Sequence, residues 1–74
     1  MFTVKVIETS TGHPVKGARV SAAFDGFFRG STEDKYTDYD GEAHFDYDNG
    51  TGTIYVNGRK AYEGRIEGRK VVYI

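Results

Sequence analysis

Apolar and polar residues alternate along most of this 74-residue chain, which is the pattern of a strand with one buried face. No window shows the sustained three-to-four-residue apolar spacing of an amphipathic helix. The alternation predicts inward rows of Phe2, Val4 and Val6, then Ala18, Val20, Ala22 and Phe24, then Ala43, Phe45 and Tyr47. Strands are predicted over residues 2–8, 18–24, 27–29, 35–42, 43–47, 53–56, 60–66 and 70–74.

Clusters of Gly, Asp, Asn, Thr and Pro separate these segments and predict turns. Asn57-Gly58 is the strongest short hairpin signal, a candidate type I′ turn. Before it, the sequence predicts a turn over 9–14, a tight Asp25-Gly26 turn, a mobile loop over 30–34 and a closing loop over 48–52.

Composition supports an all-β fold. The chain has ten glycines, six tyrosines, five phenylalanines and no leucine, whereas helical domains depend on leucine. A chain of 74 residues is long enough for only one hydrophobic core, so we expect a single domain over 1–74. The predicted fold is one antiparallel β-sandwich of about seven strands.

The net charge and the absence of long apolar runs argue against two kinds of partner, nucleic acids and membranes. A formal net charge of -1 argues against a nucleic-acid module, which usually carries a basic patch. No apolar run approaches the roughly 20 residues of a membrane span, so we expect no membrane insertion. The start of the chain lacks the pattern of a signal peptide. The sequence therefore predicts a cytoplasmic protein if Met1 is the native start, and an extracytoplasmic one if the segment was cut from a longer secreted chain.

Residues 70–74 are apolar on both predicted faces, which is unusual for a solvent-exposed edge strand. Two explanations are open: the strand lies centrally in a sheet, or another subunit covers it. The second explanation makes Val72 and Ile74 candidate interaction residues and predicts a homo-oligomer.

Two segments resemble the carboxypeptidase regulatory-like domains. Residues 11–20, TGHPVKGARV, are similar to the family's Thr-Gly-x-Pro-x-x-Gly-Ala-x-Val segment. Residues 37–45, TDYDGEAHF, are similar to its Thr-Asp-x-x-Gly-x-x-x-Phe segment. The resemblance covers residues 2 to 57 and implies a transthyretin-like sandwich of seven strands with Greek-key connections. Its motifs are structural, and such domains are often fused to receptors, peptidases or secretion-spike proteins.

We expect no catalytic residues and no enzyme. The hydrolase relatives of this fold end in a Tyr-Arg-Gly-Ser motif, whereas this chain ends in Val71-Val72-Tyr73-Ile74. His13 falls in a predicted turn and His44 on a predicted outward face, so nothing brings them to a serine.

Three kinds of binding site remain open. The charged stretch over residues 59–70 is either a binding face for an acidic partner or the solvated face of a hairpin. Acidic side chains that hard cations prefer gather in one stretch, so weak metal candidates are Asp38, Asp40, Asp46 and Asp48. The Asp-Gly and Asn-Gly turns explain most of these carboxylates without an ion, and we predict no cofactor. Aromatic side chains in loops or on outward faces suggest contact with protein or carbohydrate; they are Phe27, Phe28, Tyr36, Tyr39 and Tyr55.

The sequence therefore predicts a non-catalytic protein-interaction or assembly module, with self-association as one form of it. The alternative is a module that binds calcium or carbohydrate through the loops of residues 25–48.

Overall fold

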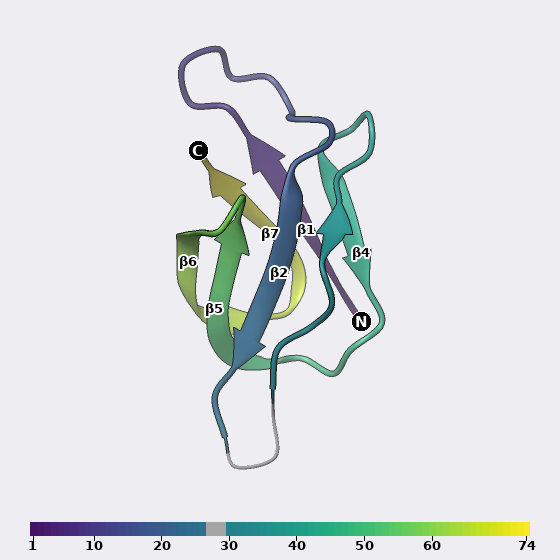
Figure 1. Ribbon diagram of the computed structural model, residues 1–74, viewed down its shortest axis with the longest axis vertical. Helices are drawn as coiled ribbons and strands as arrows, with labels where there is room; N and C mark the ends of the chain where they lie inside the picture. Colours follow the sequence, from purple (N-terminus) through teal and green to yellow (C-terminus); the bar gives the residue numbers. More distant parts are fainter. Residues whose placement is uncertain (27–29) are drawn as a thin grey trace.

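The computed structural model describes residues 1–26 and 30–74, and it is all-β, with no helix in these residues. The predicted strand over 27–29, including Phe27 and Phe28, lies outside the described residues. The described residues form seven strands (Figure 1): β1 (Phe2–Ile7), β2 (Arg19–Phe24), β3 (Lys35–Tyr36), β4 (Glu42–Phe45), β5 (Gly50–Val56), β6 (Arg59–Ile66) and β7 (Gly68–Tyr73).

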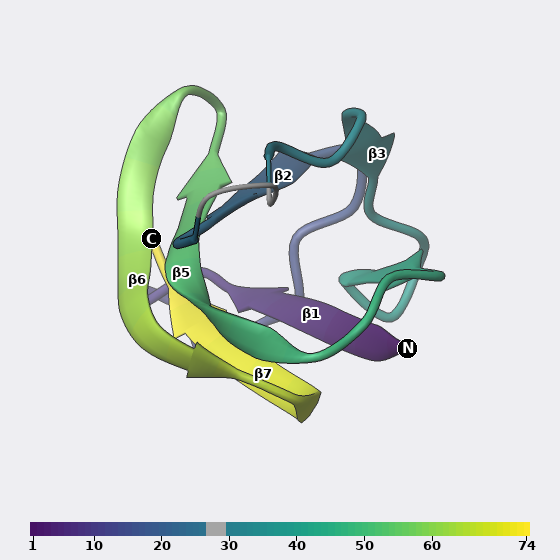
Figure 2. The same ribbon diagram turned by 90° about the horizontal axis from the view of Figure 1, so that it is seen from below.

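The strands form two sheets. One sheet has the order β4-β1-β7 and the other the order β3-β2-β5-β6. Figure 2 shows β1 and β7 on one side of the molecule and β2 and β3 on the other. All pairs are antiparallel except β1 and β7, which run parallel, so the prediction of a purely antiparallel sandwich is wrong at this pair. The reason is the connection at Glu67, where the chain passes from β6 in one sheet to β7 in the other. β7 then runs beside β1 in the same direction as β1.

Both sheets contribute to one hydrophobic core, which makes the arrangement sandwich-like. The predicted alternation is confirmed in β1 and β2, whose inward residues are buried. Phe2 is central to this core: its ring stacks on Phe45 at 4.9 Å and meets Phe24 edge-on at 5.7 Å. Such aromatic contacts add to the free energy gained by burying the rings.

The middle of the chain differs from the prediction at four places. The strand predicted over 35–42 is shorter, because β3 ends at Tyr36 and residues 37–41 lead through a turn into β4. Residues 30–32 are not a free loop, because Phe24 N–H donates to Gly30 O and Thr32 N–H donates to Ala22 O. Tyr47 is 37% exposed, because β4 ends at Phe45. The predicted loop over 48–52 is largely strand: β5 begins at Gly50, and a Cβ on Gly52 would lie 2.1 Å from Ala23 O. Gly52 therefore allows the close approach of β5 to β2 and does not form a turn.

The chain between β1 and β2 is fastened by Thr37. Its buried hydroxyl accepts from Ala18 N–H at 2.8 Å and donates to Val15 O. Its backbone N–H donates to Ala18 O, and its carbonyl accepts from Gly17 N–H. Four hydrogen bonds from one residue therefore hold residues 15–18 at the start of β2.

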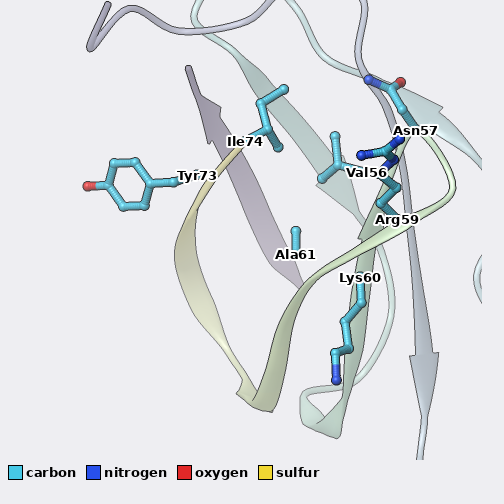
Figure 3. A pocket seen from close by; sticks show the side chains of 7 residues that line it. All are labelled: Val56, Asn57, Arg59, Lys60, Ala61, Tyr73 and Ile74. Atoms are coloured by element: carbon cyan, nitrogen blue, oxygen red, sulfur yellow. The ribbon is translucent and has the colours of Figure 1, made fainter. Parts of the chain in front are cut away.

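The β5–β6 hairpin confirms the Asn57-Gly58 prediction. Asn57 has φ 53° and Gly58 has φ 82°, the left-handed values that a type I′ turn requires at both central residues. The turn places Arg59 and Lys60 at the start of β6, close to the end of β7 (Figure 3).

Candidate functional site

A two-sheet fold has four sheet edges, and three of the edges in this protein are short or protected. Exposed edges present backbone N–H and C=O groups that can pair with another chain. β3 is only two residues long. On β4, Glu42 N–H donates to Asp38 Oδ1 at 3.0 Å and Glu42 O accepts from Asp38 N–H at 3.0 Å, so the 38–42 turn covers this edge. On β6, a register shift and exposed charged residues blunt the edge.

β7 is the fourth edge, and its outer side is open. Ile74 N–H donates to Ile7 O at 2.9 Å, and Ile74 O accepts from Thr9 N–H at 2.9 Å, so the backbone groups of Ile74 point to β1. Along a strand, the backbone N–H and C=O groups of successive residues point alternately to one side of the strand and to the other. The backbone groups of Arg69, Val71 and Tyr73 therefore point away from β1, and no strand of the described residues pairs with them. We call these three residues the β7 edge.

The side chains of the β7 edge are partly apolar and accessible. Val71 is 39% exposed and Tyr73 is 63% exposed, on the sheet face opposite the core. The half-buried Ile7 lies in register with Tyr73 and extends this apolar surface onto β1. Natural edges usually carry charge, proline or a bulge where this one carries valine and tyrosine.

A pocket of about 340 Å³ opens beside the β7 edge, between the start of β6 and the end of β7 (Figure 3). We call it the β6–β7 pocket; its lining residues are Val56, Asn57, Arg59, Lys60, Ala61, Tyr73 and Ile74. Figure 3 shows Val56, Ala61 and Ile74 around its apolar centre, with the Tyr73 ring turned outward. The pocket and the edge thus meet at Tyr73 and Ile74.

The charge around the pocket is positive. Its lining includes the side chains of Arg59 and Lys60 and no Asp or Glu side chain. Lys60 Nζ lies 3.5 Å from Glu63 Oε1, an exposed pair that contributes little to stability. Further along β7, Lys70 Nζ lies 4.6 Å from the centroid of the Tyr62 ring on β6. An anionic group at the pocket mouth would meet cations first.

The predicted interaction residues are only partly brought together. Ile74 lines the pocket. Val72 is 2% exposed and belongs to the core, so its side chain does not face a partner, and Val72→Asp would act on folding rather than on assembly. The strand is also at an edge, so the prediction that it lies centrally in a sheet is wrong.

The predicted aromatic cluster is dispersed. Tyr36 lies on β3 and is 67% exposed. Tyr39 lies in the turn before β4, with Lys16 Nζ 3.6 Å from its ring centroid. Tyr55 is half-buried on β5, and β2 separates it from Tyr36. These three tyrosines come from separate elements, and no contact between their rings is present among the described residues.

The predicted metal candidates do not form one ligand set. Of the described residues, Asp38 groups with Glu42 and His44, and Asp40, Asp46 and Asp48 are not part of that group. Each member has another partner: Glu42 Oε2 lies 3.4 Å from Arg69 Nε, and His44 Nδ1 lies 2.8 Å from Thr3 Oγ1. Cross-strand pairing on an exposed sheet face explains this cluster.

The same cluster lacks the geometry of a catalytic site. His44 Nε2 lies 3.9 Å from both Asp38 Oδ2 and Glu42 Oε1, beyond hydrogen-bonding distance. The pKa of Asp38 lies below its ordinary value because its carboxylate accepts from Glu42 N–H, and the Asp40 N–H bond and the nearby His44 add to this. The lowered pKa reflects a structural turn that covers the β4 edge.

Sequence reasoning gave no interaction role to the pocket residues Val56, Asn57 and Tyr73. It also did not foresee that Arg59, Lys60 and Ala61, at the start of the charged stretch over residues 59–70, form a pocket with Ile74. They meet because β6 runs into β7 with only Glu67 between them, which brings the first residues of β6 near the last residues of β7. The available signal was Gly68 between two strand-like segments without a connecting loop.

A comparison with models of known protein families gives no match, and a comparison with curated proteins gives none either. The described part of the chain contains no helix long and apolar enough to span a bilayer. The β7 edge and the pocket beside it are therefore the structural features from which a function is proposed.

Proposed function

We propose that this chain is a non-catalytic protein-interaction module whose β7 edge pairs with an extended segment of another polypeptide. The observation that supports this most directly is an edge with unpaired backbone groups at Arg69, Val71 and Tyr73, and with the exposed apolar side chains of Val71 and Tyr73 at its C-terminal half. Addition of a strand to such an edge is a common mode of peptide recognition, because main-chain hydrogen bonds supply affinity and pockets for alternate side chains supply specificity.

We further propose that the fold is a transthyretin-like Greek-key sandwich of the carboxypeptidase regulatory-like type. The two motif segments contact each other in support of this: Thr37 binds residues 15–18, and a Cβ on Gly41 would lie 2.7 Å from Val6 O and 2.8 Å from Pro14 Cβ. A threonine and a glycine at these positions thus have structural roles, consistent with a scaffold that presents an edge.

The test uses proline at the edge. Val71 N–H points away from β1, so Val71→Pro removes a donor needed by an added strand and no hydrogen bond of the β1–β7 ladder. The probe is a neutral eight-residue peptide of alternating valine and threonine, titrated into the isotopically labelled chain. We expect amide shifts at Arg69, Val71 and Tyr73 in the wild type and in the control Val71→Thr, and none in Val71→Pro.

Tyr73→Pro repeats the test nearer the end of the strand if Val71→Pro does not fold. The proposal is overturned if millimolar peptide leaves the β7 amides unchanged, or if the shifts persist in folded Val71→Pro.

A further inference from the structure

The β6–β7 pocket lies where an added strand would place a side chain. A segment paired with Val71 and Tyr73 would project alternate side chains to the two faces of the sheet. One set would lie beside the exposed Val71 and Tyr73, and the other would lie on the face of Val72 and Ile74, where the pocket opens. The apolar centre of the pocket, formed by Val56, Ala61 and Ile74, suits an apolar side chain.

The surroundings of the pocket favour an anionic segment. Residues 59–74 contain five cationic side chains and two acidic side chains, which gives this stretch a formal side-chain charge of +3 in a protein of net charge -1. Both carboxylates already lie near cations: Glu63 near Lys60 at 3.5 Å and Glu67 near Arg65 at 3.3 Å. Arg59 forms no ion pair with the described residues, and it lines the pocket together with Lys60.

We propose that the segment recognised at the β7 edge is an acidic extended peptide. It places one apolar side chain in the β6–β7 pocket and its neighbouring carboxylates toward Arg59 and Lys60. This inference rests on the proposed function and specifies its partner. Charge complementarity of this kind selects partners and raises association rates more than it raises affinity.

A second copy of this chain fits the edge less well. Antiparallel pairing of two β7 strands would place Arg69 and Lys70 of both copies, four cations in all, along one seam. An acidic segment instead neutralises this surface. Self-association is therefore the competing outcome in the test.

The experiment compares three eight-residue peptides with the same alternating valines and with glutamate, glutamine or lysine at the intervening positions. Binding is measured by calorimetry at low and at high salt. We expect the acidic peptide to bind about tenfold more tightly than the neutral one and to lose this advantage at high salt. The basic peptide should bind most weakly.

A charge-reversal variant tests the assigned cations. Arg59→Glu combined with Lys60→Glu should abolish the preference for the acidic peptide and leave binding of the neutral peptide intact. Lys35→Glu on β3, at the far edge of the other sheet, is the matched control and should keep the preference. Thermal melts confirm that each variant is folded.

The outcomes separate the two proposals. Equal affinity for all three peptides, abolished by Val71→Pro, would overturn the acidic preference and leave the proposed function standing. Binding of none of the three would overturn both. Concentration-dependent association that is unaffected by acidic peptide would identify a second copy as the occupant and overturn this inference.

Discussion

Single polar side chains hold the connections of this small fold. Asp38 shows how: one oxygen accepts the N–H groups of Asp40 and Glu42, so a turn is formed and the neighbouring sheet edge is covered at the same time. Thr37, the residue before it, fixes the start of β2 through its buried hydroxyl. Buried hydroxyls need such partners, because an unsatisfied polar group in the interior is costly.

The lowered pKa of Asp38 predicts an acid-dependent loss of stability. A carboxyl whose pKa is lower in the folded state than in the unfolded state stabilises the fold above the unfolded pKa, and this contribution is lost as the pH falls through the folded pKa. Asp38→Asn keeps an accepting oxygen and removes the charge. We expect the variant to melt below the wild type at pH 6, with the difference shrinking below about pH 4.

Melting temperatures measured between pH 2 and pH 7 provide the check. A constant difference across this range would show that the charge of Asp38 contributes nothing. Asp46→Asn, an exposed carboxyl outside the 38–42 turn, serves as the control.

At the scale of elements, the alternation of side chains was sufficient to predict β1 and β2 and the inward face of β4. It predicted residues 53–56 of β5 but missed residues 50–52, because Gly50 and Gly52 suggest a turn by composition although they lie inside the strand. Glycine is needed at position 52 because of a contact that is distant in the sequence: the backbone of β2 approaches too closely for a side chain there. Local patterns carry no information about such contacts.

Gly52→Ala should therefore disrupt the pairing of β5 with β2. The added Cβ would lie 2.1 Å from Ala23 O and 2.9 Å from Phe24 Cα, so the strands must separate. We expect a loss of about 3 kcal/mol in the free energy of unfolding, measured by denaturant titration.

Gly12→Ala is the contrasting variant. Gly12 has φ +75° and nothing within 4 Å of its ideal Cβ, so only backbone strain of about 1 kcal/mol is expected. Equal losses for the two variants would contradict the close approach of β5 and β2.

The candidate site belongs to the scale of the whole molecule, which explains why the sequence revealed little of it. Two-sided apolarity of residues 70–74 correctly marked an unusual strand, but strand order decides that β7 is an edge and that Val72 faces inward. The pocket requires the passage from one sheet to the other at Glu67, which brings Ala61 and Ile74 together. Neither feature has a local signature.

The chain alone should be monomeric at micromolar concentration in low salt. Cations on both copies oppose pairing of two β7 edges, and salt screens that repulsion. Light scattering coupled to size exclusion should give the 8.3-kDa mass of one chain, with weak association increasing as salt is raised. A stable dimer in low salt would show that homotypic pairing is the dominant use of the edge.

The parallel alignment of β1 and β7 also determines how the protein responds to tension. Phe2 opens β1 and Tyr73 closes β7, and Figure 1 shows the chain ends at opposite ends of this strand pair. A force pulling these two residues apart slides one strand along the other, so the hydrogen bonds joining six residue pairs share the load and must yield together. Pulling on the open end of an antiparallel hairpin such as β5–β6 would break its bonds in succession. The strand whose outer side is unpaired is thus, on its inner side, the one that resists this force.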